Sequence, residues 1–296
     1  MLLKEMNEPL VSVAVVTYNS SKTVVETLDS IANQTYPNLE LIVSDDCSTD
    51  NTIEICRKWI DEHKDRFVRT ELLTVEKNTG VSANMNRAAD ECKGEWVKDI
   101  AGDDLLLPEC IEIYVDYVIE HPETVYVFAK VEHFGGDEEA RRYIENNYSD
   151  MEAFFKMSIE EQYNYLTLVC NPIYAPTSFY NRAKVISIGI RNDERIPFEE
   201  DRAKWINCLK AGVRFGFINK ITVRYRLSDS SLCRNQDKHA IARAQVYVYY
   251  CFHNDLKVRG KKEAVLRWIR SQRTIHNNAV VWRIISKLYR MLFGMK

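Results

Sequence analysis

The sequence predicts an α/β fold, in which a mostly parallel, Rossmann-like sheet is flanked by helices and followed by a C-terminal helical extension. The first observation is a set of short, nearly continuous apolar runs, such as 10–17 and 39–44, which are typical of strands buried on both faces. The second is that segments with helical spacing, such as 51–63, separate these runs, as βαβ units require. The third is a polar turn after each of the first four runs, so we expect these turns to share one edge of the sheet.

The elements follow in a regular order up to residue 129. Strands are expected at 10–17, 39–44, 67–75, 95–100 and 124–129. Helices are expected after Ser20 through about Asn33, and at 51–63, 82–92 and 108–120. In the second of these helices, Ile53, Cys56 and Trp59 recur at helical spacing.

The alternation weakens after residue 130. There we expect a loop with short helices, a brief strand, a helix that ends at Gly212, two further strands and three final helices. The expected short helices are 148–157 and 159–168, the strands are 178–180, 214–217 and 220–227, and the final helices are 237–253, 262–275 and 279–293.

Charge is spread unevenly along the chain. The 296 residues carry a net charge of −3, but residues 256–296 hold eleven Lys or Arg and one acid, Glu263, a net of +10. Within this segment, 279–293 places apolar residues such as Ile284 on one side and basic residues on another. This pattern is typical of a helix lying on an anionic membrane surface, and the alternative is a helix docked on the domain. We expect no nucleic-acid partner, because no recognisable binding module accompanies the basic tail.

Cysteine spacing and hydropathy indicate the compartment. The eight cysteines are scattered without a CxxC pair, so we expect reduced thiols in the cytoplasm. The N-terminus lacks the apolar stretch of a signal peptide, and no run of eighteen apolar residues is present. We therefore expect a cytoplasmic protein that is peripheral to the membrane.

Two adjacent carboxylates, Asp103 and Asp104, follow the apolar run 95–100. Such a pair repels itself unless a cation relieves the charge, and Mg²⁺ or Mn²⁺ prefers oxygen ligands shared with substrate phosphates. The alternative is a solvated acidic turn before the helix near Pro108. Because GxGxxG and P-loop motifs are absent, a bound diphosphate would need such a metal.

Two further acidic clusters follow the same logic. Asp45 and Asp46 can accept hydrogen bonds from a base or ribose, or they can form an Asx turn before a helix capped by Ser48 or Asp50. The cluster 199–201 opens a helix, where the dipole alone favours anions, yet a carboxylate there could also be a general base. A hydrolase triad has no support, because GxSxG is absent.

Taken in order with the runs around them, these clusters resemble family 2 glycosyltransferases of the GT-A fold. The resemblance covers about residues 10–230, and the motifs are individually modest but jointly specific. They are 11–19 (VSVAVVTYN), 45–50 (DDCSTD), 78–86 (NTGVSANMN), 93–96 (KGEW), 102–104 (GDD) and 200–201 (ED).

The resemblance implies an inverting transfer of a sugar, in which Asp201 is the catalytic base. Asp104, with Asp103, would bind Mn²⁺ or Mg²⁺, and Tyr18 and Asp46 would hold the base of the nucleotide. The residues expected to contact substrate are Thr17, Tyr18, Asn19, Asp46, Asn78, Gly80, Asn86, Asp103 and Glu200.

Three positions depart from the family pattern. Met85 falls where many relatives carry Arg, so that recognition is lost or moved to Arg87. Ala101 replaces the first Asp of a longer acidic motif. Ser228 falls where many relatives carry a His, which puts a third protein ligand for the metal in doubt.

The resemblance divides the chain into a glycosyltransferase domain, 1–235, and a basic helical extension, 236–296. Within the domain, 8–130 would bind the nucleotide-sugar, which the resemblance implies is a UDP-sugar. The segment 131–235 would bind the acceptor, a glycan or a lipid-linked sugar in cell-surface polysaccharide synthesis. The competing hypotheses are a metal-dependent nucleotidyltransferase and a non-catalytic nucleotide-binding assembly subunit. The oligomeric state is not readable from the sequence.

Overall fold

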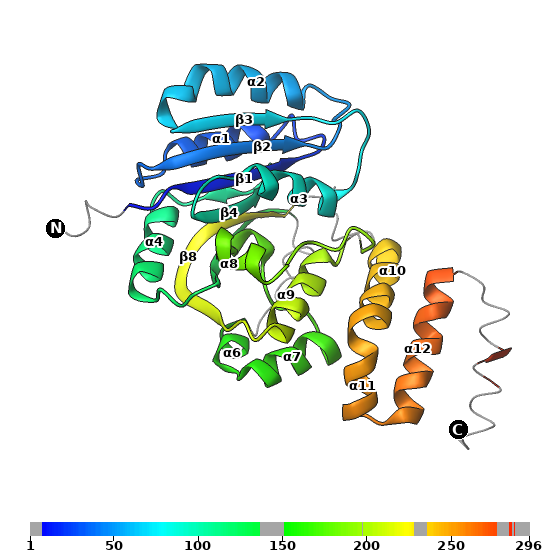
Figure 1. Cartoon of the computed structure of the whole chain (residues 1–296). Coiled ribbons are helices and arrows are strands. Elements are labelled where there is room, and N and C mark those ends of the chain that lie inside the picture. The colour runs from blue at the N-terminus through cyan, green and yellow to red at the C-terminus, as the bar shows by residue number, and fades with distance from the viewer. Residues whose placement is uncertain are drawn as a thin grey trace.

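The computed structural model describes residues 8–136, 151–196, 198–227 and 236–276, together with 284, 285 and 287. These residues form an eight-stranded sheet with helices on both faces and a group of helices beyond one end (Figure 1). The predicted α/β fold is confirmed.

The sheet has the strand order β3-β2-β1-β4-β7-β6-β8-β5. Six strands run in one direction, while β7 and β5 run against it. The strands are β1 (Val11–Thr17), β2 (Leu39–Asp45), β3 (Arg69–Leu73), β4 (Trp96–Ala101), β5 (Leu105–Leu106), β6 (Tyr126–Gly135), β7 (Phe179–Asn181) and β8 (Phe215–Leu227).

Helices connect and cover these strands. The α-helices are α1 (Val24–Ala32), α2 (Thr52–His63), α3 (Val81–Glu91), α4 (Cys110–Glu120), α6 (Met151–Lys156), α7 (Ile159–Leu168), α8 (Arg182–Ser187), α9 (Glu200–Lys210), α10 (Gln236–Val246), α11 (Phe252–Val258) and α12 (Lys261–His276). Shorter helical segments are η1 (Lys64–Arg66), η2 (Ala175–Thr177) and the π-helical η4 (Tyr247–Cys251).

Alternate residues of β1 serve two separate cores. Val13 and Val15 pack with residues of α1, α2 and α4 on one face of the sheet. Ala14 belongs to the cluster on the other face, which contains residues of α3, α7 and α9. Both faces are therefore buried, which explains why the strand reads as a continuous apolar run.

The strand register aligns the ends of β1, β2 and β4. Thr17 pairs with Asp45, and Val16 pairs with Ala101. The polar turns after these three strands therefore lie along one edge of the sheet, as expected.

Two predicted strands, 214–217 and 220–227, form the single strand β8. Its pairing with β6 shifts register at Ala129 and Lys130, which pair with Ile218 and Ile221. This bulge interrupts the two-residue periodicity, so the sequence reads as two strands. The helix α8 and the short strand β5 were not predicted.

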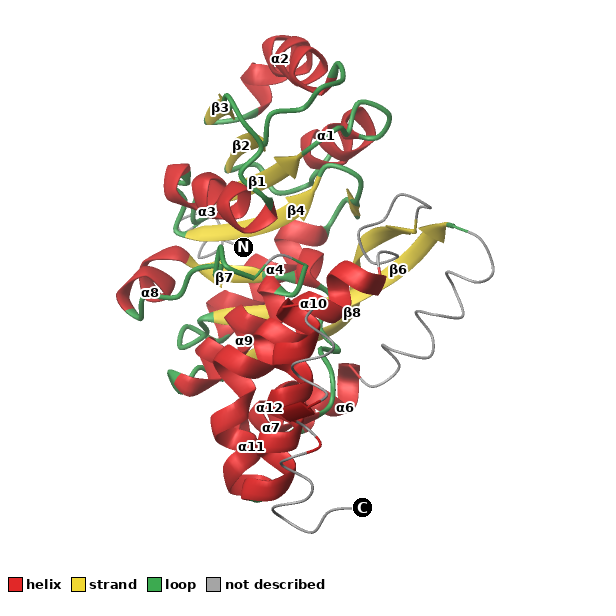
Figure 2. Cartoon of the chain, turned by 90° about the vertical axis from the view of Figure 1, so that its right-hand side faces the viewer, coloured by secondary structure: helices red, strands yellow, loops and turns green. Residues whose placement is uncertain are grey.

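The C-terminal helices pack beside the second half of the sheet (Figure 2). Val246, Tyr247 and Cys251 belong to the same hydrophobic cluster as Trp205 of α9. The boundary at residue 235 stays a prediction. The predicted helix 279–293 and the start of 148–157 lie outside the described residues, apart from 284, 285 and 287.

Two further findings concern the described part of the chain. Its seven cysteines are all free, and five of them are buried. None of its helices is long and apolar enough to cross a bilayer.

Candidate active site

The turns after β1 and β2 are joined through the last residue of β1. The Thr17 carbonyl accepts hydrogen bonds from the Asp46 amide at 3.0 Å and from Asn84 Nδ2 at 3.2 Å. The Thr17 hydroxyl donates to Asp45 Oδ2 at 2.7 Å. Thr17 thus holds three segments together at the sheet edge: the turns after β1 and β2, and α3.

Asp46 organises the loop that precedes α3. Its carboxylate accepts hydrogen bonds from the Thr79 amide and hydroxyl, from the Gly80 amide at 2.7 Å and from Arg87 at 3.2 Å. Asn78 Nδ2 donates to the Asp46 carbonyl at 3.1 Å. Burial alone would raise the pKa of Asp46, but these hydrogen bonds hold it below the ordinary value. Whether Asp46 also contacts the base of a nucleotide stays a prediction.

Arg87, the residue to which the recognition lost at Met85 could move, binds the Asp46 carboxylate. Besides Asp46, its guanidinium contacts the Ser44 hydroxyl and Asn84 Oδ1 at 2.8 Å. A cation is thus present in the loop system that follows β2, on α3 rather than at position 85.

Tyr18 and Asn19 form the exposed part of the turn after β1. Asn19 adopts a φ of 53°, and its side-chain oxygen accepts a hydrogen bond from the Thr49 amide at 2.8 Å. This geometry leaves the Tyr18 side chain 50% exposed. An exposed ring on a fixed turn can stack on a base or a sugar.

The predicted N-cap at Ser48 or Asp50 is wrong, because Asn51 is the N-cap residue of α2 and makes no side-chain cap, although Asp50 holds the start of the helix. Asp50 Oδ1 accepts a hydrogen bond from the Thr52 amide at 3.0 Å, and Oδ2 accepts one from the Ser21 amide at 3.2 Å. Ser48 instead donates to Asp45 Oδ2. Asp45 is therefore occupied by the turn itself, which leaves Asp46 as the carboxylate facing the 78–80 loop.

Asp103 and Asp104 follow β4 next to the end of β1. The Gly102 amide donates to the Val16 carbonyl at 2.9 Å. Asp104 is buried, and its Oδ1 accepts a hydrogen bond from the Arg226 amide at 2.8 Å. Arg226 Nε donates to the Asp103 carbonyl at 2.7 Å. The end of β8 therefore closes over the carboxylate pair.

The electrostatics of this pair fit a divalent cation. Burial and the neighbouring Asp103 carboxylate raise the pKa of Asp104 well above its ordinary value, and burial also raises the pKa of Asp103. No cluster of three or more metal-ligating side chains occurs among the described residues. Two carboxylates suit Mg²⁺ or Mn²⁺, which complete their shells with water and phosphate oxygens. Ser228 lies outside the described residues, so the question of a third ligand stays open.

Glu200 and Asp201 lie in the first turn of α9. Asp201 interacts electrostatically with Lys204 and with Asp99 of β4, so the third acidic cluster lies near the strand that precedes Asp103 and Asp104. Asp201 Oδ1 and Glu200 Oε2 are buried and have no hydrogen-bond partner within the described structure. Burial raises the pKa of Asp201, while burial and Asp201 together raise the pKa of Glu200 to about 8.

The remaining predicted site residues are mainly engaged with the protein. Buried Asn86 donates from Nδ2 to the Asn192 carbonyl at 3.1 Å and accepts from the Asn192 amide at 3.1 Å. Gly80 adopts a φ of 91° at the start of α3, where its amide reaches Asp46. Substrate contact by these residues stays a prediction. Tyr174 and Tyr180 are buried in the core.

Lys98 and Arg226 are structural contributors that the sequence did not reveal. Fully buried Lys98 donates from Nζ to the carbonyls of Asp99, Pro176 and Ser178. A lysine inside the apolar run 95–100 was the only signal in the sequence, because two of its three partners lie about eighty residues away in the chain.

The fold and this site define a sugar-transferring enzyme class, and comparison with known proteins identifies it. The model of the family described as "Glycosyl transferase family 2" matches residues 12–188, so the chain belongs to that family. The predicted family resemblance is thereby confirmed.

Individual relatives and solved structures share low sequence identity with this chain. The chain is 27% identical over 239 residues to the Escherichia coli protein "UDP-Glc:alpha-D-GlcNAc-diphosphoundecaprenol beta-1,3-glucosyltransferase WfaP", covering 80% of this chain and 85% of that one. It resembles the structure of S. aureus TarS 1-349 in complex with UDP-GlcNAc, with a TM-score of 0.63 and 20% identity over 88% of this chain and 79% of that one. It also resembles the Pyrobaculum calidifontis mannosyltransferase PcManGT in complex with GDP-Man and Mn²⁺, with a TM-score of 0.58 and 19% identity over 97% of this chain and 76% of that one. The two structures support the GT-A fold alone.

Proposed function

We propose that this protein transfers a sugar from a UDP-sugar to a hydroxyl of a glycan or lipid-linked acceptor, with inversion at the anomeric carbon. Family membership supports sugar transfer as the reaction class. The UDP-sugar and the lipid-linked acceptor are supported by the name of the E. coli relative. The observation that carries the proposal is the buried Asp201 carboxylate oxygen, which has no hydrogen-bond partner within the described structure and interacts electrostatically with Asp99 of β4, the strand that precedes Asp103 and Asp104.

The donor would bind along the edge formed by the turns after β1, β2 and β4. The exposed Tyr18 ring would stack on the base, and Asp46 would fix the 78–80 loop around the nucleoside. Asp103 and Asp104 would hold Mg²⁺ or Mn²⁺, which would offset the negative charge on the departing diphosphate. Arg226 keeps Asp104 oriented through its backbone amide.

Asp201 would accept the proton of the acceptor hydroxyl. A carboxylate oxygen without a protein partner is free to receive that hydrogen bond, and its raised pKa makes it a stronger base than an exposed Asp. Lys204 lies close enough to stabilise the ionised form. One displacement without a covalent enzyme intermediate inverts the anomeric carbon, and alignment of the two substrates supplies much of the rate.

Replacing the proposed base separates binding from chemistry. Asp201→Asn should bind UDP with Mn²⁺ as the wild type does but lose transfer by about 10²-fold or more, because the amide cannot accept the proton. Titration calorimetry with UDP and a radiolabelled-sugar transfer assay measure the two properties. Asp104→Asn, in contrast, should lose metal-dependent UDP binding.

The matched control is Asp90→Asn, which neutralises an exposed acid on α3 that pairs with Arg191. It should keep both binding and transfer. Wild-type transfer rates in Asp201→Asn would eliminate Asp201 as the base, and unchanged UDP affinity of Asp104→Asn with metal and with chelator would eliminate the proposed metal site.

We also propose that the enzyme works in the cytoplasm at the membrane surface. The net charge of +10 on residues 256–296 and the amphipathic pattern of 279–293 support this location. The exposed side chain of Ile284 agrees with an apolar side that the described part of the protein does not cover.

A further inference from the structure

A pocket of about 370 Å³ lies between α7, α9 and the C-terminal helices. Its volume is within the range of small-molecule sites, and it is partly open to solvent. The residues that line it are Thr167, Leu168, Val169, Arg202, Ala240, Arg243, Ala244, Tyr247, Cys251, Arg267, Arg270, Ser271 and Thr274.

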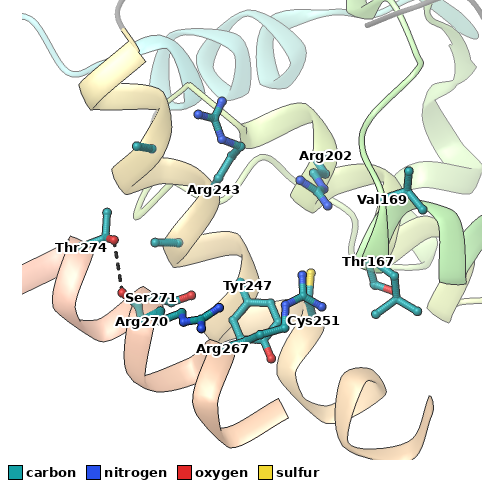
Figure 3. A pocket seen from close by; sticks show the side chains of 13 residues that line it. Thr167, Val169, Arg202, Arg243, Tyr247, Cys251, Arg267, Arg270, Ser271 and Thr274 are labelled. Carbon is teal, nitrogen blue, oxygen red and sulfur yellow. Dashed lines mark hydrogen bonds between the residues drawn. The ribbon is translucent and has the colours of Figure 1, made fainter. Parts of the chain in front are cut away.

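Four arginines, and no acidic residue, line this pocket. Figure 3 shows that they come from three different helices: Arg202 from α9, Arg243 from α10, and Arg267 and Arg270 from α12. Guanidinium groups from separate helices repel one another, so bringing them together is unfavourable unless an anion neutralises them. The hydroxyls of Thr167, Ser271 and Thr274 add possible donors for the same ligand.

Nearby carboxylates neutralise only part of this charge. Glu199 lies 3.9 Å from Arg243, and Asp255 lies 3.1 Å from Arg267 but also pairs with Arg259. Among the described residues, no carboxylate lies within ion-pair distance of Arg202 or Arg270. The pocket therefore keeps a positive charge that an anionic ligand can match.

We propose that this pocket binds the diphosphate group of the acceptor. The proposal rests on the function proposed above. All four cations are arginines rather than lysines, and the planar fork of the guanidinium matches phosphate oxygens in pairs. A diphosphate has two negatively charged phosphate groups, so arginines from different helices can bind it at the same time. The name of the E. coli relative includes an acceptor of this chemical class.

The position of the pocket suits the acceptor. Arg202 directly follows Asp201 in α9, and consecutive helix residues point about 100° apart around the axis. Within this turn of α9, Asp201 therefore points toward Asp99 of β4, while Arg202 points into the pocket. A diphosphate bound to Arg202 would therefore lie next to the helix turn that carries the proposed base.

The test measures anion binding without catalysis. Inorganic pyrophosphate is titrated in chelator into the full-length wild type and into the double variant Arg243→Gln, Arg270→Gln. Both arginines are exposed, and the Arg243 side chain is 48% exposed, so the variant should fold. We expect the affinity for pyrophosphate to fall at least tenfold, which corresponds to about 1.4 kcal/mol. The donor site is identical in both proteins, so the difference reports the pocket.

Arg273→Gln is the matched control, because it removes the same charge from an exposed position of α12 outside the pocket. It should bind pyrophosphate as the wild type does. Equal affinity of wild type and double variant, or an equal loss in Arg273→Gln, would overturn the proposal. A circular dichroism spectrum identical to that of the wild type establishes that the double variant is folded.

A second arm tests the acceptor role and the source of the diphosphate. The double variant should raise the KM for the acceptor at least tenfold while kcat changes by no more than about twofold; an unchanged KM would refute the acceptor role. Phosphatidylcholine vesicles that carry farnesyl diphosphate should bind the wild type better than the double variant if the diphosphate is lipid-borne, and soluble pyrophosphate alone should show the difference if it is not. Failure of the proposed transfer would abolish turnover in the wild type but leave pyrophosphate binding intact.

Discussion

Gly102, in the turn after β4, packs closely against Thr17, the last residue of β1, and against Ser20 in the turn that follows it. A Cβ atom on Gly102 would lie 2.8 Å from Thr17 Cγ2 and 3.3 Å from Ser20 Oγ. Thr17 cannot yield easily, because its hydroxyl is held by Asp45 and its backbone lies in β1. Glycine at 102 therefore allows the turn after β4 to approach the turn after β1.

We predict that Gly102→Ala destabilises the protein by about 1–3 kcal/mol and weakens UDP binding, because the added methyl overpacks this contact. Chemical denaturation and UDP titration with Mn²⁺ measure the two effects. The double variant Gly102→Ala, Thr17→Ser removes the clashing Cγ2 but keeps the hydroxyl, so it should recover part of both losses. No recovery would show that the Thr17 contact is not the cause.

At the scale of elements, the first turn of α9 combines buried acids with a helix N-terminus. The pKa of Glu200 rises from an ordinary value of 4.5 to about 8, through burial and the neighbouring Asp201. The folded protein thus holds a proton that the unfolded chain releases over this interval. Its contribution to stability is complete below pH 4.5 and is lost as the pH rises to about 8.

Glu200→Gln should therefore flatten the decline in the free energy of unfolding between pH 5 and 8, since the amide stays neutral throughout. Urea denaturation at several pH values measures this slope for the wild type and the variant. Glu54→Gln, which removes an exposed acid from the first turn of α2, is the control and should leave the slope unchanged. Parallel slopes for wild type and Glu200→Gln would contradict the assignment.

Elements whose signal is local could be predicted from the sequence. The strands β1, β2 and β4 and the helices α1 to α4 follow apolar patterns within a few residues of the expected bounds. The β5 strand could not be predicted, because two residues carry no period, and its pairing with β8 spans more than a hundred residues. The bulge in β8 likewise depends on its partner β6.

The candidate site divides in the same way. The carboxylates were identified as motifs because each cluster is contiguous in the chain. The partners that hold them were not, since the Arg226 amide that binds Asp104 belongs to a strand 122 residues away. The electrostatic contact of Asp99 with Asp201 also depends on tertiary packing of α9 against β4.

For the whole molecule, the charge difference between the C-terminal segment and the rest predicts an oriented approach to an anionic surface. Deleting residues 279–296 should release the protein from anionic phosphatidylglycerol vesicles in a co-sedimentation assay. Replacing Arg283, Lys287 and Arg290 by Gln in the full chain should weaken binding in a salt-sensitive way, because the apolar side is kept. Unchanged co-sedimentation of the truncated protein would refute the anchor.

The lysine inside β4 limits how this enzyme could be recombined with its relatives. Lys98 presents its ammonium group to the carbonyls of Pro176 and Ser178, so a charge in β4 is partly solvated by backbone from the segment that leads into β7. In a hybrid protein whose residues 131–235 come from a relative, buried Lys98 would lose these two hydrogen bonds unless the new segment places carbonyls at the same positions. Exchange of this segment would therefore succeed most readily in a relative that has an apolar residue at the position of Lys98. It would also succeed with grafts that leave residues 176–178 unchanged.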